Sequence, residues 1–329
     1  MADSNVSNSI GIDAGSKTSK AAYSDSSGTR IVAKLEGFDV NALREESEIK
    51  LDDIITSCVI ALPDDFTKRQ HEDILTAAKR SGFDNIDLIS EYEAMNWAID
   101  SDSGTALICD FGASRVNLAV IGSDELIDSE IISDFGGNEC DKVFASWLSD
   151  RFTLNLIDEK LLRERAEQIK FTLGVSDSLT WRNIEIQRED FERLIYFPVK
   201  RITHHARKFM RIYKPDKFIL SGGMSSVPLI RKLFTESLNI SPEINADLIA
   251  KGAALKAKEF YESETIRTHN HNENLQRLRE LKSEIIELEA NLTRSQKDRL
   301  YLLFRQAEGI NDSKIIALME GLINELKNV

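Results

Sequence analysis

The 329-residue sequence has few cysteines, and the three present, Cys58, Cys109 and Cys140, lie far apart. Two of them fall in or beside predicted strands, which is typical of small core residues in a reducing compartment and not of disulfides or metal ligands. The sequence also lacks any run of the ~20 apolar residues that a membrane-spanning helix needs. Residues 1–8 contain neither a basic region nor an apolar segment. We therefore expect a cytoplasmic protein without a membrane partner.

A run of basic residues is absent as well. The formal net charge is -13 and the pI is near 5.0, and so acidic a surface argues against nucleic acid or an anionic membrane as partner. No Ser-His-Asp order, Cys–His pair or cluster of metal-binding cysteines is evident. His269 and His271 stand in a polar stretch, where solvated side chains are expected. With 42% hydrophobic residues, the chain can bury a full core and is long enough for two or more domains.

Two similar turns stand out in the first half of the sequence. Residues 10–24, IGIDAGSKTSKAAYS, combine an apolar strand, an Asp-x-Gly turn and a second apolar run. Residues 106–121 repeat the pattern, so that Asp110-Phe-Gly112 echoes Asp13-Ala-Gly15. In each copy a strand delivers a carboxylate, and the glycine lets backbone N–H groups face an anion. The repetition indicates a duplicated unit, and two such turns facing each other would bind a metal-bound polyphosphate.

A third turn follows a strand later in the chain. Residues 217–228 carry the pair Gly222-Gly223 between a predicted strand and a predicted helix. Paired glycines permit close approach of the backbone to a bulky ligand such as a purine. Three turns in this order are more specific than any one of them alone.

With these turns, the chain resembles the actin-like ATPase superfamily and, within it, the seventy-kilodalton heat-shock chaperones of the DnaK type. The resemblance covers roughly residues 9–262. It also rests on four further segments, Val59-Ile-Ala-Leu-Pro63, Leu88-Ile-Ser-Glu-Tyr-Glu-Ala94, Phe135-Gly-Gly-Asn-Glu-Cys-Asp141 and Asp247-Leu-Ile-Ala-Lys-Gly-Ala-Ala254. It implies an α/β, two-lobed actin-like ATPase fold with duplicated mixed-sheet halves. The first lobe would take about 8–103 plus 230–262, and the second about 104–229.

The resemblance further implies a site for ATP or ADP with Mg²⁺. Asp13 and Asp110 would orient waters of the magnesium ion, Glu91 would position the attacking water, and Lys20 would contact phosphate. The chain would then be a possible ATPase, converting ATP and water to ADP and phosphate. The residues implied as cofactor-binding are Gly15, Ser16, Lys17, Thr18, Gly112, Ala113, Ser114, Arg115, Gly136, Gly137, Glu167, Lys170, Phe171, Gly174, Gly222, Gly223, Met224 and Ser226.

Simpler interpretations stand beside several of these assignments. Glu91 also suits a helix N-terminus, where the dipole favours a carboxylate. Lys20 also suits an exposed strand edge, and Glu167 with Lys170 suits a solvated pair on a helix surface. These alternatives stay open on the sequence alone.

The sequence departs from the family at three places. Ala113 and Ser114 add side chains where glycines would let the backbone touch phosphate, and Arg115 replaces a threonine. The arginine would either pair with phosphate or fill the site. At the two positions where arginines would sandwich the base, the chain has Phe171, which can stack on a purine, and Ser226, which cannot. We therefore expect weak nucleotide binding and slow hydrolysis or none.

Hydrophobic periodicity predicts the remaining elements. We expect strands near 20–24, 30–35, 54–62, 86–89, 106–109, 116–121, 126–132, 181–187 and 217–221, and helices near 64–81, 92–99, 138–151, 158–173 and 189–213. The family resemblance implies a further, closing helix at 247–254. Residues 36–53 carry no predicted element. They leave no room for the family's insertion at this point, and we assign no replacement here for the lysine that the insertion carries; Lys20 would supply the lost charge.

The C-terminal part differs in composition. Residues 263–274 are polar and predict a linker or a helix start. Residues 275–329 show apolar residues at spacings of three and four, which predicts a helical hairpin or three-helix bundle, its second helix closed by Gly309 and its third capped by Asn311 or Asp312. No series of short strands follows Phe260, so a peptide-binding β-sandwich is not expected. The tail would dock on the ATPase body or bind a protein partner or co-chaperone.

Three functions compete at this stage. The leading hypothesis is a DnaK-like ATP-binding chaperone protein, a slow Mg-dependent ATPase whose lobe closure changes how the tail meets its partner. The alternative is a non-catalytic pseudo-ATPase scaffold, favoured by the losses at Ala113, Ser114, Arg115 and Ser226. A small-molecule kinase of the same superfamily ranks last, because no substrate-binding insertion is visible.

Overall fold

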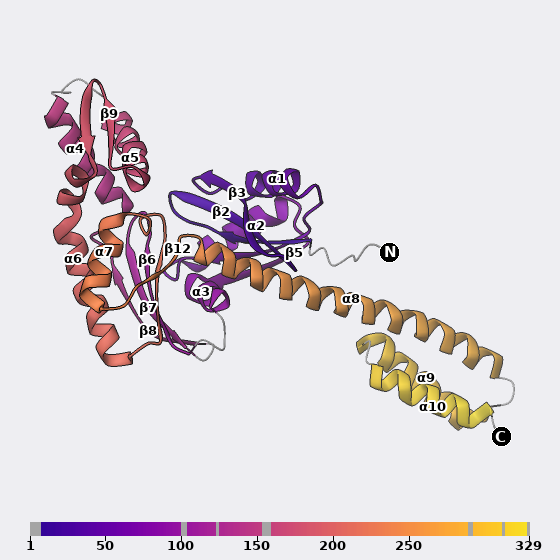
Figure 1. Cartoon of the computed structure of the whole chain (residues 1–329). Coiled ribbons are helices and arrows are strands. Elements are labelled where there is room, and N and C mark those ends of the chain that lie inside the picture. Colours follow the sequence, from indigo (N-terminus) through magenta and orange to yellow (C-terminus); the bar gives the residue numbers. More distant parts are fainter. Residues whose placement is uncertain are drawn as a thin grey trace. The chain divides into compact units, whose positions relative to one another are not determined.

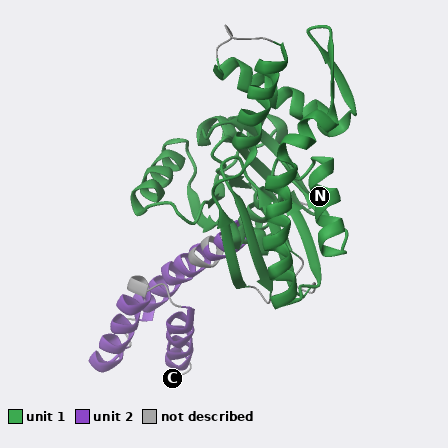
Figure 2. Cartoon of the chain, turned by 90° about the vertical axis from the view of Figure 1, so that its left-hand side faces the viewer, with its two compact units in different colours: residues 1–259 green, residues 260–329 purple. Residues whose placement is uncertain are grey.

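The chain divides into two compact units, Met1–Glu259 and Phe260–Val329 (Figure 2). The computed structural model describes residues 8–99, 104–122, 125–152, 159–288, 292–310 and 313–327, without the side chains at 268–271 and 308–310. In the described residues, no helix is both long and apolar enough to cross a membrane.

The first sheet of unit 1 has five strands in the order β3-β2-β1-β4-β5. β1, β2 and β3 form an antiparallel meander, whereas β4 and β5 run parallel to β1. This arrangement confirms the partly parallel sheet predicted from the alternation of strands and helices. The bounds are β1 Ser9–Asp13, β2 Thr18–Asp25, β3 Gly28–Glu36, β4 Ser57–Leu62 and β5 Asn85–Ser90.

The second sheet of unit 1 repeats the first. Its order is β12-β11-β6-β7-β8, with β6, β7 and β8 as the antiparallel meander and with β11 and β12 parallel to β6. Each strand of the first sheet thus has a counterpart here, and the predicted duplication and two-lobed fold are confirmed. The bounds are β6 Ala106–Phe111, β7 Val116–Gly122, β8 Glu125–Ile132, β11 Lys217–Ser221 and β12 Glu243–Asn245.

Helices cover these sheets (Figure 1). α1 packs on β2 and β3, α2 on β5, and α6 on β6 and β7, while α3 contacts strands of both sheets. Because helices and sheets enclose them, β4, β6 and β7 are buried along their whole length and are almost wholly apolar. The helices of unit 1 are α1 Val40–Leu51, α2 Lys68–Arg80, α3 Glu91–Ala98, α4 Gly137–Phe152, α5 Glu159–Val175, α6 Arg188–Tyr213, α7 Pro228–Leu238 and the first part of α8 Leu248–Leu288.

Two helix boundaries differ from the sequence-based expectation. Residues 36–53, predicted without structure, contain α1, whose first N–H groups donate to the side chain of its N-cap residue Asp39. α2 begins at Lys68 and not at Asp64, because Thr67 and Gln70 form a capping box that fixes its start.

The predicted strand at 181–187 is a hairpin of two strands, β9 Ser178–Trp181 and β10 Ile184–Gln187. Arg182 and Asn183 connect them with φ angles of 52° and 62°. Two successive residues with positive φ are typical of the tight turn that matches the twist of a two-stranded ribbon. The prediction joined both strands because it took neither residue as a turn former.

The predicted lobe boundary at residue 230 is too early. The ring of Phe234 in α7 lies 5.9 Å from that of Phe111 and 5.3 Å from that of Phe218, and β12 pairs with β11. The second lobe therefore continues to the end of β12. The chain returns to the first lobe with α8, whose first turns pack against β1 and α3 at Gly11 and Gly252.

Unit 2 is helical, as predicted for the tail. It comprises the second part of α8 with α9 Arg294–Ile310 and α10 Ser313–Lys327. The polar stretch 263–274, predicted as a linker or helix start, lies within α8. α9 continues one residue past Gly309, and the predicted caps Asn311 and Asp312 lie outside the described residues. The buried core is formed by Leu278, Leu281, Ile285, Leu300, Phe304, Ala307, Ile316, Met319 and Ile323.

Gly252 allows a first testable prediction. A Cβ atom at this position would lie 1.7 Å from the carbonyl oxygen of Ala94, so we expect Gly252→Ala to lower the free energy of unfolding by about 1–3 kcal/mol. Gly174 in α5 has nothing within 4 Å of such an atom, and Gly174→Ala should instead be neutral or raise stability by up to about 1 kcal/mol. Trp97, Trp147 and Trp181 all belong to unit 1, so urea denaturation followed by tryptophan fluorescence reports on the relevant part. Equal stability of the two variants would contradict the close packing of α8.

Candidate functional site

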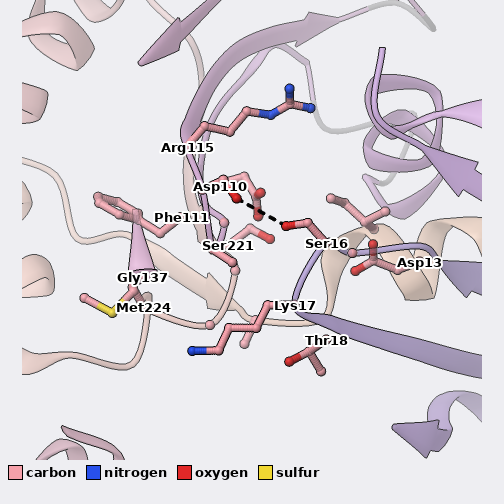
Figure 3. Close-up of a pocket in the computed structure, with 18 of the residues that line it drawn as sticks. Asp13, Ser16, Lys17, Thr18, Asp110, Phe111, Arg115, Gly137, Ser221 and Met224 are labelled. Carbon is pink, nitrogen blue, oxygen red and sulfur yellow. Dashed lines mark hydrogen bonds between the residues drawn. The ribbon is translucent and has the colours of Figure 1, made fainter. Parts of the chain in front are cut away.

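Both Asp-x-Gly turns face one cavity of about 350 Å³ in unit 1 (Figure 3). Its volume lies within the ~300–1,000 Å³ that is usual for small-molecule sites. Asp13 and Asp110 both line it, one from each sheet. The placement that the polyphosphate hypothesis requires is therefore present.

Most of the predicted site residues line this cavity. Gly136, Gly174 and Ser226 do not: Gly136 packs beneath the second turn, Gly174 lies apart in α5, and Ser226 is exposed. The predicted residues that line it are Asp13, Gly15, Ser16, Lys17, Thr18, Lys20, Glu91, Asp110, Gly112, Ala113, Ser114, Arg115, Gly137, Glu167, Lys170, Phe171, Gly222, Gly223 and Met224.

The repeated sheet topology explains why the two carboxylates meet. Asp13 lies on β1 opposite Lys20 on β2 and Ala61 on β4. Asp110 occupies the corresponding place on β6, opposite Asn117 on β7 and Ser221 on β11. Each carboxylate thus stands on the central strand of its sheet, at the edge that faces the other sheet's turn.

Glycine is required at two of the turns by close approach of the backbone. A Cβ atom at Gly15 would lie 2.2 Å from the carbonyl oxygen of Thr18. At Gly222 the φ angle is +80°, and a Cβ atom would lie 2.3 Å from the carbonyl oxygen of Phe111. The first and third turns are therefore as tight as the sequence indicates.

The second turn is arranged differently. The N–H groups of Gly137 and Asn138, at the start of α4, donate to the carbonyl oxygens of Gly112 and Ala113 at 3.0 and 2.8 Å. These carbonyls use helix N-terminal donors that would otherwise face an anion. Ser114 contacts the first turn directly, its Oγ lying 3.4 Å from that of Ser16 (Figure 3).

The acidic side chains of the cavity destabilise one another's charged forms. The pKa of Asp13 is raised to about 7, mainly by burial and also by the charges of Asp110 and Asp247, against the lowering effect of Lys20. Burial also raises the pKa of Asp110, against the lowering effect of a hydrogen bond with Ser221. A cation between the two carboxylates would relieve this cost.

Glu91 is the third buried carboxylate. Its pKa is raised to about 8, mainly by burial and also by the charges of Asp110 and Asp13, against the lowering effect of Arg115. Its Oε2 accepts from Asn117 Nδ2 at 3.3 Å and from an Arg115 guanidinium nitrogen at 3.5 Å. Glu91 also stands in the first turn of α3, as its interpretation as a helix N-terminal carboxylate requires.

Arg115 and Lys17 link the two lobes across the cavity. Arg115 on the second lobe pairs with Asp65 of the first lobe at 2.9 Å as well as with Glu91. Lys17 on the first lobe pairs with Asp141 at 2.9 Å and with Glu167 at 2.7 Å, both on the second lobe. Each cation therefore already has carboxylate partners from the protein.

Lys20 and Lys170 are likewise paired. Lys20 Nζ lies 3.0 Å from Asp247 Oδ1 and donates to the carbonyl oxygen of Ala246, so it is not a solvated strand-edge residue. Lys170 is buried and pairs with Asp141, so it is not a solvated surface residue either. Phe171, half exposed at the rim, offers a ring face for stacking; Lys170 Nζ lies 5.4 Å from its centre.

The residues fit a hydrated cation with an anionic ligand. Asp13, Glu91 and Asp110 all have raised pKa values, and among the described residues the Oδ1 atom of buried Asn117 has no hydrogen-bond partner. The part of the chain that the structure describes contains no group of three side chains close enough to hold a metal ion directly. A magnesium ion keeps several waters, so Asp13 and Asp110 would contact it through those waters.

Several lining residues were not predicted. Asp141 neutralises both Lys17 and Lys170, Asp65 holds Arg115, and Asn117 donates to Glu91. Asp141 ends the segment Phe135–Asp141 that the family resemblance singled out, and its position there was an available signal. Asn117 had a signal as well, because it is the counterpart of Lys20 in the repeated pattern.

Two lobes with the same strand order, meeting over a cavity with a carboxylate from each, define the two-lobed actin-like ATPase fold. The family model for "Hsp70 protein" matches residues 29–271, and the chain belongs to the Hsp70 family. It is 29% identical over 230 residues to the "Chaperone protein HscA homolog" of Rickettsia africae (strain ESF-5), covering 66% of this chain and 38% of that protein. The homologue of Rickettsia akari (strain Hartford) is 30% identical over 229 residues, covering 65% and 38%. The chain thus spans well under half the length of these relatives.

The raised pKa of Asp13 predicts a pH effect on stability. Between pH 5 and 7 this carboxyl is protonated in the folded protein and ionised in the unfolded chain, so raising the pH favours unfolding. When the pH is raised from 5 to 8 without nucleotide or metal, the free energy of unfolding of Asp13→Asn should rise by at least about 1 kcal/mol relative to that of the wild type. Urea denaturation at both pH values measures the difference.

Asp25→Asn is the matched control. Hydrogen bonds with Ser27 and Arg30 hold the pKa of Asp25 below its usual range. Asp25 is therefore ionised in both the folded and the unfolded protein above pH 5, and its effect on stability no longer changes with pH. Its stability difference from the wild type should therefore stay constant up to pH 8. A constant difference for Asp13→Asn would mean that Asp13 is ionised throughout.

Proposed function

We propose that this chain binds ATP or ADP together with Mg²⁺ in the cavity and acts as a slow ATPase of the chaperone type. The observation that carries the proposal is the meeting of Asp13 and Asp110 in one cavity from equivalent strands of two sheets. The charge of Asp110 raises the pKa of Asp13, so ionising both carboxylates raises the energy of the site without a cation, which favours binding of a metal-bound anion.

The two turns would hold the phosphates, through residues 15–18 on the first lobe and 112–115 on the second. Phe171 would stack on the purine, with Glu167 and Lys170 near the ribose. The magnesium ion, when bound, would neutralise the negative charge of the phosphates. Glu91, with its pKa raised to about 8, would position the attacking water and accept its proton.

Ligand binding would act on the contacts between the lobes. Three contacts join a residue of the first lobe to a residue of the second: Lys17–Asp141, Arg115–Asp65 and Ser16–Ser114. Four of these residues, Ser16, Lys17, Ser114 and Arg115, are implied phosphate-binding residues. A polyphosphate that takes over Lys17 and Arg115 would change how the lobes are held. α8 is one continuous helix that begins in unit 1 and supplies part of unit 2, and we propose that the helical tail meets a protein partner or co-chaperone.

The relatives support the chaperone class. Their printed name is that of a chaperone protein. Because the match covers only 38% of the length of the Rickettsia africae protein, a chaperone role for this chain is a proposal. The three cysteines are all buried and free, which favours a reducing, cytoplasmic setting.

Calorimetric titration tests the proposal directly. ATP should bind in the presence of Mg²⁺, and Asp110→Asn should weaken this binding by about 10- to 100-fold because a carboxylate that orients the metal's waters is lost. In EDTA, the wild type and the variant should bind nucleotide equally weakly, which provides the control. Absence of binding by the wild type at millimolar ATP and Mg²⁺ would refute nucleotide binding.

One observation favours the second candidate, a nucleotide-binding scaffold without hydrolysis. Glu91 is engaged by Arg115 and by Asn117, and Arg115 is only 19% exposed. A base held by a fixed cation loses affinity for protons and does not turn freely toward a water. If these contacts persist when nucleotide is bound, the protein binds ATP and does not turn it over.

Arg115→Ala distinguishes the two candidates. If the arginine restrains Glu91, the variant should hydrolyse ATP about tenfold or more faster at saturating nucleotide, within the 10²–10⁴-fold that a positioned base contributes. Phosphate release measures the rate, and Asp65→Asn is the control because it removes the other partner of Arg115 and leaves Glu91 engaged. A slower rate with weakened ATP binding would instead assign Arg115 to phosphate contact.

A further inference from the structure

Five cationic side chains line the cavity, and their partners differ. Lys17 pairs with Asp141 and Glu167, Lys20 with Asp247, Lys170 with Asp141, and Arg115 with Asp65 and Glu91. Each of these four charges is compensated by a carboxylate of the protein. The fifth cation is Lys34.

Lys34 is exposed, and it forms no hydrogen bond or ion pair with any residue that the structure describes. It was not predicted as a site residue, because it lies within β3 and outside the three turns on which the site prediction rested. Among the described residues, Lys34 is therefore the one cation of the cavity that a ligand would contact without displacing a carboxylate of the protein.

The sheet register places Lys34 close to the proposed metal-binding carboxylate. Asp13 on β1 is paired with Lys20 on β2, and Lys20 is paired with Lys34 on β3. Neighbouring strands lie about 4.7–4.9 Å apart, so the three side chains form a charged row across the sheet, on the face that lines the cavity.

Two lysines directly opposite each other on antiparallel strands repel. In the second sheet the corresponding position, opposite Asn117, is Ile131, so the fold itself does not require a cation there. The first sheet thus carries a positive charge that no contact of the folded protein explains. An anion beside the two lysines would turn this repulsion into attraction.

We propose that Lys34 binds the phosphate chain of the ligand and distinguishes a nucleoside polyphosphate from a nucleoside. This inference rests on the proposed function, because the cavity must take an anionic ligand. An ammonium group is a compact charge on a long flexible stem, so it contacts phosphate oxygens without a fixed geometry. The chain carries a net charge of -13, and an uncompensated lysine in the cavity therefore supplies local attraction for an anion.

The test compares Lys34→Ala and Lys34→Arg with Lys79→Ala, an exposed lysine of α2 that does not line the cavity. Calorimetry measures the Kd of ATP with Mg²⁺, of inorganic tripolyphosphate with Mg²⁺, and of adenosine. Lys34→Ala should weaken ATP and tripolyphosphate by about tenfold or more and leave adenosine unchanged, because one charged hydrogen bond is lost. Lys34→Arg should recover most of the affinity, and Lys79→Ala should match the wild type.

The outcomes separate this inference from the proposed function. Unchanged ATP affinity in Lys34→Ala overturns the role of Lys34 and leaves nucleotide binding intact. The wild type could bind tripolyphosphate but not ATP. If Lys34→Ala then loses tripolyphosphate binding, the result supports the role of Lys34 in phosphate binding and overturns nucleotide binding. Equal loss of adenosine binding would show a structural effect and not phosphate contact. Failure of the wild type to bind any of the three ligands overturns both.

Discussion

The repulsion between Asp13 and Asp110 is the interaction on which the site depends. Duplicated sheets place one carboxylate on each central strand, and the close meeting of the two lobes buries both at one cavity. Burial is the largest cause of the raised pKa of both residues, and the charge of Asp110 contributes to the pKa of about 7 at Asp13. The lobes are held together despite this cost by ion pairs of Lys17 and Arg115 that cross the same cavity.

Backbone packing fixes the positions of these carboxylates. The first turns of α8 press against β1 so closely that a Cβ atom at Gly11 would lie 1.9 Å from the backbone nitrogen of Ala254. The turn between β12 and α8 brings Asp247 and Ala246 to Lys20, which stands opposite Asp13. The turn that leads into α8 is therefore in direct contact with Lys20 of the charged row.

The sequence-based analysis succeeded where a short local pattern encodes a position in the sheet. The Asp-x-Gly turns and Gly222-Gly223 predicted the cavity because strand ends and tight turns are local features. It missed α1, whose buried face is only Val40, Leu43 and Ser47, although Asp39 was an available capping signal. It also missed Asp141 as the partner of Lys17, 124 residues earlier in the chain, because only the meeting of the two lobes brings them together.

Charge compensation limits what a ligand can do in this cavity. A phosphate that paired with Lys17 would leave Asp141 with Lys170 as its remaining cationic partner among these ion pairs. A phosphate that paired with Arg115 would break the ion pairs of this arginine with Asp65 and Glu91. Each exchange breaks a contact between the lobes, so the affinity gained at the phosphate is reduced by the lobe contact that is lost. A ligand shifts a conformational equilibrium only by its difference in affinity for the two states. If Lys17 and Arg115 bind phosphate as proposed, phosphate binding and the ion pairs between the lobes would compete for the same two charges.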